Sequence, residues 1–135
     1  MKPSLITYIL ALLFWLTSLP LKTYSAVGSD GAKWQGLLNL LIGVLGLFLG
    51  VYAWLANPLF ILAAVTYFTA ENKIVPFILA ALGLLFALSF LFHKNIPIDE
   101  AGHQGEITTY HLGYWIWVLA MLCMTVACYI KMKNQ

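Results

Sequence analysis

Residues 34 to 54 read WQGLLNLLIGVLGLFLGVYAW, an apolar run of helix length with a tryptophan at each end. Every third and fourth position along this run is small or a short amide: Gly36, Asn39, Gly43, Gly46, Gly50 and Ala53. In water each of these glycines would weaken a helix by about 1 kcal/mol relative to alanine. In lipid, a stripe of small residues instead lets another helix approach closely. The pattern predicts a membrane helix over 34–54 with one packing face.

The composition of the whole chain points to the same class of protein. The 135 residues are 62% hydrophobic and only 9% charged, whereas soluble domains carry about 25% charged residues. With a net charge of +2, nucleic acid is not an expected partner. The expected fold is an all-α, polytopic membrane helix bundle that forms a single membrane domain over 1–135.

The apolar segments allow four to five transmembrane helices, since each crossing needs about 20 residues. The expected ranges, with a polar outer loop at 94–110, are 5–19, 34–54, 58–70, 74–92 and 112–130. The first segment is either a retained span or a cleaved signal peptide. The flank around Ala26 is a poor cleavage site, because Tyr24 is bulky, which favours a retained span.

A sharp hairpin is expected at Asn57 and Pro58, because asparagine is a good N-cap and proline suits the first position of a helix. One straight helix through both flanking segments would be too long for a single crossing. The segment 58–70 is short, so it either crosses a thinned membrane or only re-enters it.

Two features of the spans predict how the helices pack. Small residues recur in the segment 74–92 at the same spacing as in 34–54, which makes these two segments natural partners: Ala80, Gly83 and Ala87. Among the polar residues within the apolar segments, Asn39 is the one expected to need a partner on another helix, because hydroxyls can bond to their own helix.

Lysines at the end of the last segment, Lys131 and Lys133, favour a cytoplasmic C-terminus. Five spans with the N-terminus outside would place five of the seven lysines inside. A re-entrant segment 58–70 with the N-terminus inside would place four of the seven there. Both arrangements put the loop 94–110 outside, and the side of the N-terminus stays open.

Few residues are candidates for a catalytic or metal-binding role. The middles of all five segments lack ionisable side chains, which argues against proton-coupled transport, voltage sensing and intramembrane hydrolysis. We therefore expect no catalytic, cofactor-binding or metal-binding residues. Cys123 and Cys128 are expected to be buried apolar residues. The outer loop and its edges hold a set that could bind a metal ion but whose spacing matches no strong motif, so that a solvated connector is favoured: His93, Lys94, Asp99, Glu100, His103, Glu106 and His111.

Two short motifs carry a family resemblance. The run Trp54-Leu55-Ala56-Asn57-Pro58-Leu59 fits W-x-A-N-P-L, and Leu112-Gly113-Tyr114-Trp115-Ile116-Trp117 fits L-G-Y-x-x-W. Over roughly 36–121 the chain resembles a widespread group of small bacterial membrane proteins of unknown function. The resemblance implies a bacterial inner membrane and a bundle of four or five helices. It implies no activity.

The expected function is that of a non-enzymatic integral membrane protein that binds another membrane protein, as an accessory or interaction subunit, or that associates with itself. One specific form is an immunity protein that blocks a membrane-active toxin. A small transporter or channel with an uncharged pore is the alternative from another class, and a metal or haem site in the outer loop is the third.

Overall fold

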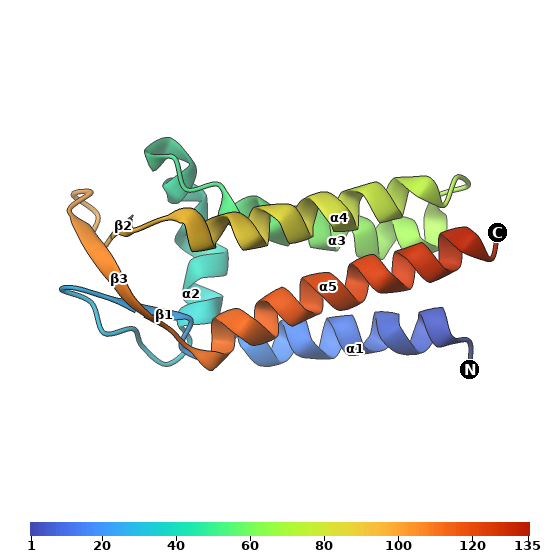
Figure 1. Ribbon diagram of the computed structural model, residues 1–135, viewed down its shortest axis with the longest axis horizontal. Helices are drawn as coiled ribbons and strands as arrows, with labels where there is room; N and C mark the ends of the chain where they lie inside the picture. Colours follow the sequence, from blue (N-terminus) through green and yellow to red (C-terminus); the bar gives the residue numbers. More distant parts are fainter.

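Four long helices lie side by side in the computed structural model, which describes residues 1–135 (Figure 1). They are α1 (Pro3–Ser18), α3 (Ala56–Thr69), α4 (Ile74–Ser89) and α5 (Leu112–Lys133). Helix α5 packs against both α1 and α4, and α4 packs against α3. Both chain termini and the turn between α3 and α4 lie at one end of the bundle, and a small sheet lies at the other (Figure 1). Helical residues make up 66% of the chain.

Alanines form much of the bundle core, because a small side chain lets neighbouring helices approach closely. Six of them are completely buried within the long helices: Ala11, Ala56, Ala63, Ala87, Ala120 and Ala127. Larger side chains fill the space between these contacts, and the most buried are Phe60, Tyr67, Met121 and Met124. The core therefore depends on close backbone contact as much as on bulky apolar groups.

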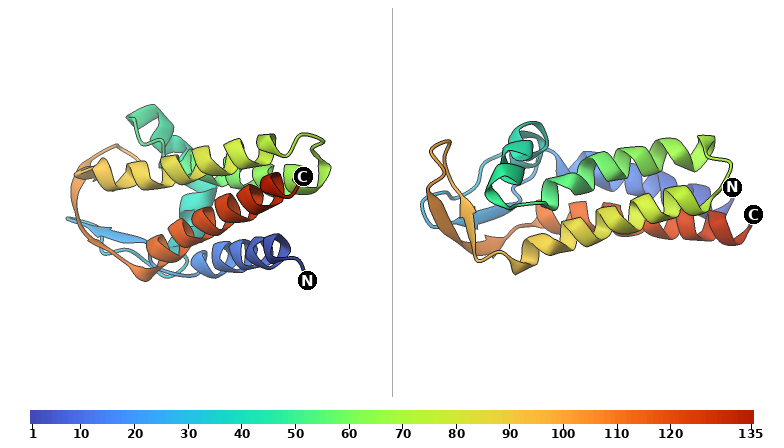
Figure 2. Two further views of the ribbon diagram at one scale, coloured as in Figure 1. Left: turned by 45° about the vertical axis from the view of Figure 1, so that its right-hand side comes forward. Right: turned by 90° about the horizontal axis from the view of Figure 1, so that it is seen from above.

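The expected single helix over 34–54 is wrong. The chain forms a short α2 (Gln35–Ile42), the 3-10 helix η1 (Gly43–Leu49) and, after a reversal, the 3-10 turn η2 (Ala53–Leu55). The 8 residues of α2 span about 12 Å. Figures 1 and 2 show this segment lying across the sheet end of the bundle instead of along it.

The chain reverses at Gly50, and not at the expected Asn57-Pro58 hairpin. Gly50 has a φ of +81°, a left-handed conformation that glycine adopts without steric cost, and Val51 N then donates to the Gly46 carbonyl. Asn57 and Pro58 instead lie in the first turn of α3, directly after η2. Proline is tolerated there because a first-turn N–H has no partner within the helix.

The all-α expectation missed a three-stranded antiparallel sheet of order β1-β3-β2. Its strands are β1 (Tyr24–Ala26), β2 (Asn95–Pro97) and β3 (Gln104–Tyr110), so the expected loop 94–110 is largely a β-hairpin. The register pairs Tyr24 with Tyr110 and Asn95 with Glu106. The sheet joins the bundle through a second apolar cluster, formed by Ala26, Ala53, Phe90, Ile96 and Tyr114.

Two helical segments are long and apolar enough to cross a membrane, α4 continued by η3 (Phe90–Phe92) and α5. Helices α1 and α3 are apolar but shorter. Each of the four long helices exposes large apolar side chains along its outer face. All twelve charged side chains lie at the two ends of the bundle or in the segments that join its helices.

Candidate functional site

The side chain of Asn57 connects three helices at the sheet end of the bundle. Its Oδ1 accepts a hydrogen bond of 3.2 Å from Trp15 Nε1 of α1 and one of 2.9 Å from Trp117 Nε1 of α5. An indole N–H can only donate, so the atom that faces both rings must be the amide oxygen. Asn57 is only 7% exposed. This junction holds the start of α3 between α1 and α5.

The role of Asn57 differs from the one expected from the sequence. The sequence predicted a hairpin at this residue and predicted that Asn39 is the amide that needs a partner. Asn39 is half-buried, and its Nδ2 donates to Thr23 Oγ1 over 3.0 Å. The missing signal was the tryptophans: an indole N–H buried in a helix bundle needs an acceptor, and Asn57 is the buried amide that supplies it.

The two motifs of the family resemblance meet at this junction, since Asn57 belongs to the first and Trp117 to the second. In the first motif, Trp54 Nε1 donates to the Leu40 carbonyl over 2.9 Å, which ties η2 to α2. In the second, the buried Tyr114 hydroxyl donates to the Ala87 carbonyl of α4 over 2.9 Å. Gly113 lies so close to the backbone of Lys22 that a Cβ would overlap it. Each of these motif residues therefore has a contact that joins separate elements.

Most of the small-residue stripe packs away from α4, contrary to expectation: Gly36 lies against Ser18 and Leu19, Asn39 bonds Thr23, Gly43 faces Trp54 and Gly46 faces Val51. Its last member, Ala53 in η2, does meet the segment 74–92, where it is buried with Phe90. The expected partners of the stripe, Ala80, Gly83 and Ala87, are buried inside the bundle. A Cβ on Gly83 would meet Leu59 and the Ala56 carbonyl of α3. Tertiary folding of α2 across the bundle end separates the two sets.

A cavity of about 550 Å³ lies between α2, η1, the sheet and the sheet end of the bundle, and we call it the end cavity. Its walls are mostly apolar, with residues such as Ile42, Val51 and Ile98. Asn57 and Trp117 of the junction line it as well. Gln35 also lines it, and its amide bonds the backbone of Thr23 and Tyr24, which fixes α2 against β1. The end cavity is therefore built from segments that are distant in sequence.

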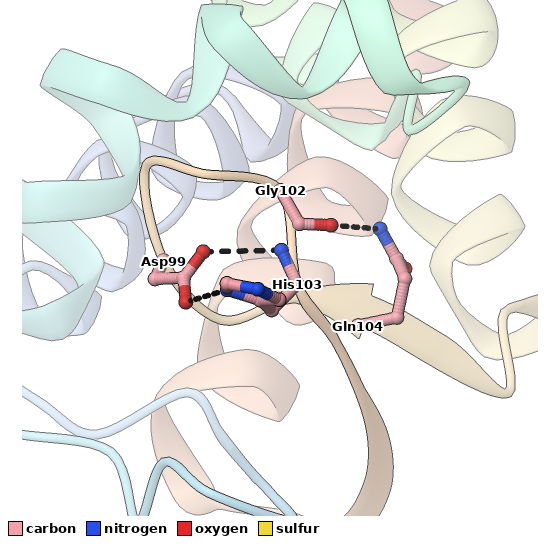
Figure 3. Close-up of polar contacts among 4 residues, drawn as sticks. All are labelled: Asp99, Gly102, His103 and Gln104. Carbon is pink, nitrogen blue, oxygen red and sulfur yellow. Dashed lines mark hydrogen bonds and ion pairs between the residues drawn. The ribbon is translucent and has the colours of Figure 1, made fainter.

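The charged residues that line the end cavity are all acidic: Asp30, Asp99 and Glu100. Asp99 Oδ1 accepts a hydrogen bond of 3.0 Å from the backbone N–H of His103, and Asp99 Oδ2 lies 2.5 Å from His103 Nδ1 (Figure 3). Both residues lie within the turn that joins β2 to β3. The hydrogen bond from the His103 side chain lowers the pKa of Asp99 most, and the one from the His103 backbone lowers it further. Asp99 therefore stays ionised at neutral pH. Asp30 and Glu100 make no ion pair, since Asp99–His103 is the one in the structure.

Ser25 and His111 form a close pair at the edge of the sheet, with Ser25 Oγ 2.6 Å from His111 Nε2. The serine hydroxyl also donates to the Asp30 carbonyl over 2.7 Å. The pair therefore links β1 to the start of α5.

An apolar groove of about 400 Å³ runs between α1 and α3 on the side of the bundle, and we call it the α1–α3 groove. Its lining residues are Tyr8, Leu12, Trp15, Phe60, Ile61, Ala64, Val65, Phe68 and Thr69. Stacked aromatic pairs bridge the two helices, with ring centroids 4.6 Å apart for Tyr8–Tyr67 and 5.6 Å apart for Trp15–Phe60. These rings hold α1 and α3 further apart than small residues at the same positions would.

The remaining candidates from the sequence do not come together. No three of the histidine, cysteine, aspartate and glutamate side chains form a group that could hold a metal ion. Cys123 and Cys128 are free thiols on α5, the first half-buried and the second buried. No family model, curated protein or solved structure matches this chain.

Proposed function

We propose that this protein is a non-enzymatic integral membrane protein that crosses a bacterial inner membrane with α1, α3, α4 and α5, and that it binds another membrane protein. The partner is a transmembrane helix that occupies the α1–α3 groove. The bacterial inner membrane rests on the motifs Trp54–Leu59 and Leu112–Trp117.

The distribution of charge supports four crossings. None of the helices α1, α3 and α4 contains a charged residue, and α5 contains only Lys131 and Lys133 in its last turn. The 16 residues of α1 span about 24 Å, which is short of the roughly 30 Å of an average hydrocarbon core. Local thinning of the bilayer compensates for such a mismatch at modest cost.

The orientation of the bundle follows from the charges at its ends. The end with both termini carries four lysines and one acidic residue: Lys2, Lys73, Lys131, Lys133 and Glu71. The sheet end carries three lysines and four acidic residues: Lys22, Lys33, Lys94, Asp30, Asp99, Glu100 and Glu106. Cytoplasmic segments are enriched in lysine and arginine. The proposal therefore places both termini in the cytoplasm and the sheet outside.

The α1–α3 groove carries the proposal of a protein partner. Within a membrane, helices associate through close packing and hydrogen bonds, because lipid tails are as apolar as the side chains. The groove offers a shaped surface of this kind: Ala64 is a small residue on its wall and Thr69 brings a hydroxyl. A partner helix that matches the shape of the groove would gain close packing along it.

A matched pair of variants tests the groove. Ile61 and Leu62 are neighbours on α3 with side chains 47% and 50% exposed, but only Ile61 lines the groove. After co-purification in a mild detergent, we expect a stoichiometric membrane-protein partner with the unchanged chain and with Leu62→Trp. We expect at least a tenfold loss of that partner with Ile61→Trp.

Three outcomes would contradict the proposal. The chain could always be recovered alone, or Ile61→Trp could retain the partner as well as Leu62→Trp does. The recovered species could also be a dimer of this chain, identified by its mass. That result would show self-association at the groove and no other protein as the partner.

A further inference from the structure

We propose that the end cavity binds a cationic amphiphile, a small molecule with an apolar body, an oxygen acceptor and an amine. The apolar body would occupy the cavity, the oxygen would face Asn57, and the amine would lie near Asp30, Asp99 and Glu100. This inference goes beyond the proposed function, because the end cavity and the α1–α3 groove share no lining residue.

The size and walls of the end cavity fit a small organic molecule. Its volume of about 550 Å³ lies within the range of about 300–1,000 Å³ that is usual for ligand pockets. Side chains from four different elements provide apolar walls: Leu38 and Ile42 of α2, Leu45 of η1, Ala53 of η2 and Ile96 of β2. An apolar ligand body is therefore favoured in the interior.

Asn57 provides a hydrogen-bond donor that no protein group uses. Its Oδ1 accepts from Trp15 and Trp117, while its Nδ2 makes no hydrogen bond within the protein. No fully buried side-chain nitrogen or oxygen lacks a partner, so this unpaired Nδ2 is not fully enclosed by protein, and Asn57 lines the end cavity. The residue as a whole is nevertheless buried, with 7% of its surface exposed. A ligand oxygen placed there would satisfy the donor.

The acidic residues decide the sign of the ligand charge. Asp30, Asp99 and Glu100 line the cavity, and no lysine or histidine does so. An anionic headgroup would be repelled by all three, whereas an amine would be attracted. Two opposite charges about 4 Å apart in water gain roughly fivefold in binding. Charge complementarity therefore favours a cation over a neutral or anionic molecule of the same shape.

Three probes that share one apolar chain and one amide carbonyl test this inference on the full chain in a non-ionic detergent. They are N-(2-aminoethyl)octanamide, N-(2-hydroxyethyl)octanamide and N-octanoylglycine, which are cationic, neutral and anionic at neutral pH. The readout is the rise in the midpoint of thermal unfolding with probe concentration, since a ligand that binds only the folded state raises it. We expect the amine to bind about fivefold more tightly than the alcohol, and the carboxylate to bind most weakly.

Two variants place the binding in the cavity. Ile42→Trp enlarges a cavity-lining side chain, and Leu41→Trp is its control, because Leu41 is the adjacent residue of α2 and does not line the cavity. We expect Ile42→Trp to weaken amine binding at least fivefold and Leu41→Trp to leave it unchanged. The triple variant Asp30→Asn, Asp99→Asn, Glu100→Gln changes only exposed side chains and should remove the advantage of the amine over the alcohol.

Equal binding of the amine and the carboxylate would overturn the inference. Unchanged binding of the amine to Ile42→Trp would overturn it as well, provided that the variant shows the helical circular dichroism of the unchanged chain. If Ile42→Trp fails to fold, the triple variant decides, because a persistent preference for the amine would exclude the acidic residues as its cause.

Discussion

Trp117 Nε1 and Asn57 Oδ1 are joined by a hydrogen bond of 2.9 Å across 60 residues of sequence. The same oxygen accepts from Trp15, so one amide side chain holds the ends of three helices together. Two of the three residues belong to the short motifs that the sequence displays most clearly. The junction lies next to η2, and Asn57 and Trp117 also line the end cavity.

Replacing Asn57 with alanine should destabilise the protein by about 1–3 kcal/mol, because two indole N–H groups lose their acceptor. Asn39→Ala removes one hydrogen bond from a half-buried amide and should cost less than about 1 kcal/mol. Unfolding in mixed micelles of increasing dodecyl sulfate content, followed by circular dichroism, measures both. Equal effects of the two variants would contradict the central role of Asn57.

Two glycines in helices should respond oppositely to alanine. A Cβ on Gly113 would overlap the Lys22 carbonyl and lie 3.0 Å from Leu21 Cβ, whereas the nearest atom to a Cβ on Gly83 is Leu59 Cβ at 3.4 Å. Gly113→Ala should therefore destabilise by about 1–3 kcal/mol, and Gly83→Ala should be neutral or stabilising by up to about 1 kcal/mol. Thermal unfolding compares them, and a tolerated Gly113→Ala would show that the 21–23 segment can move aside.

Charged substitutions distinguish α2 from a spanning helix. Leu41 and Leu85 are similarly exposed, at 67% and 63%, but Leu41 lies on α2 across the bundle end and Leu85 lies in the middle part of α4. Leu85→Lys should impair membrane insertion by about 2.5–3.5 kcal/mol. Leu41→Lys should have a much smaller effect. Membrane insertion assays in vesicles provide the measurement, and an equal penalty at both positions would restore the single span over 34–54.

Chemical labelling tests which face of the membrane each end of the bundle occupies. In a chain with Cys123 and Cys128 replaced by serine, single cysteines are introduced as Gln104→Cys on β3 or Gln135→Cys at the terminus. A membrane-impermeant maleimide applied to intact spheroplasts should label the first and not the second. Labelling of Gln135→Cys after permeabilisation is the control. The reverse pattern would invert the proposed orientation.

The helices of the bundle were largely predictable, because each is a continuous apolar run with charged residues beyond its ends. The expected segments 5–19, 58–70, 74–92 and 112–130 lie on α1, α3, α4 with η3, and α5. The segment 34–54 was not predictable, although its composition is just as apolar. Its glycines allow a 3-10 helix and a left-handed turn at Gly50, and hydropathy does not distinguish an apolar segment that crosses lipid from one that lies across a bundle end.

The candidate site was less predictable than the bundle. The sequence identified small residues and short amides in the apolar segments, but it paired the stripe of 34–54 with α4, and Gly83 packs against α3 instead. Helical spacing predicts which residues share one face of a helix, but it does not predict which other element that face contacts. The sheet was missed for a related reason, since β1 and β3 are separated by 77 residues between Ala26 and Gln104, and strand pairing over that separation leaves no local pattern.

The sequence by itself determined that the chain is mostly helical and where its long helices lie, because long apolar runs bounded by charged residues are visible in composition and run length alone. Only the tertiary structure decided that residues 34–54 lie across the bundle, that Asn57 joins Trp15 to Trp117, and that three carboxylates line one apolar cavity. Each of these is a contact between segments far apart in the chain, and such contacts arise from the packing of the whole molecule instead of from local preference.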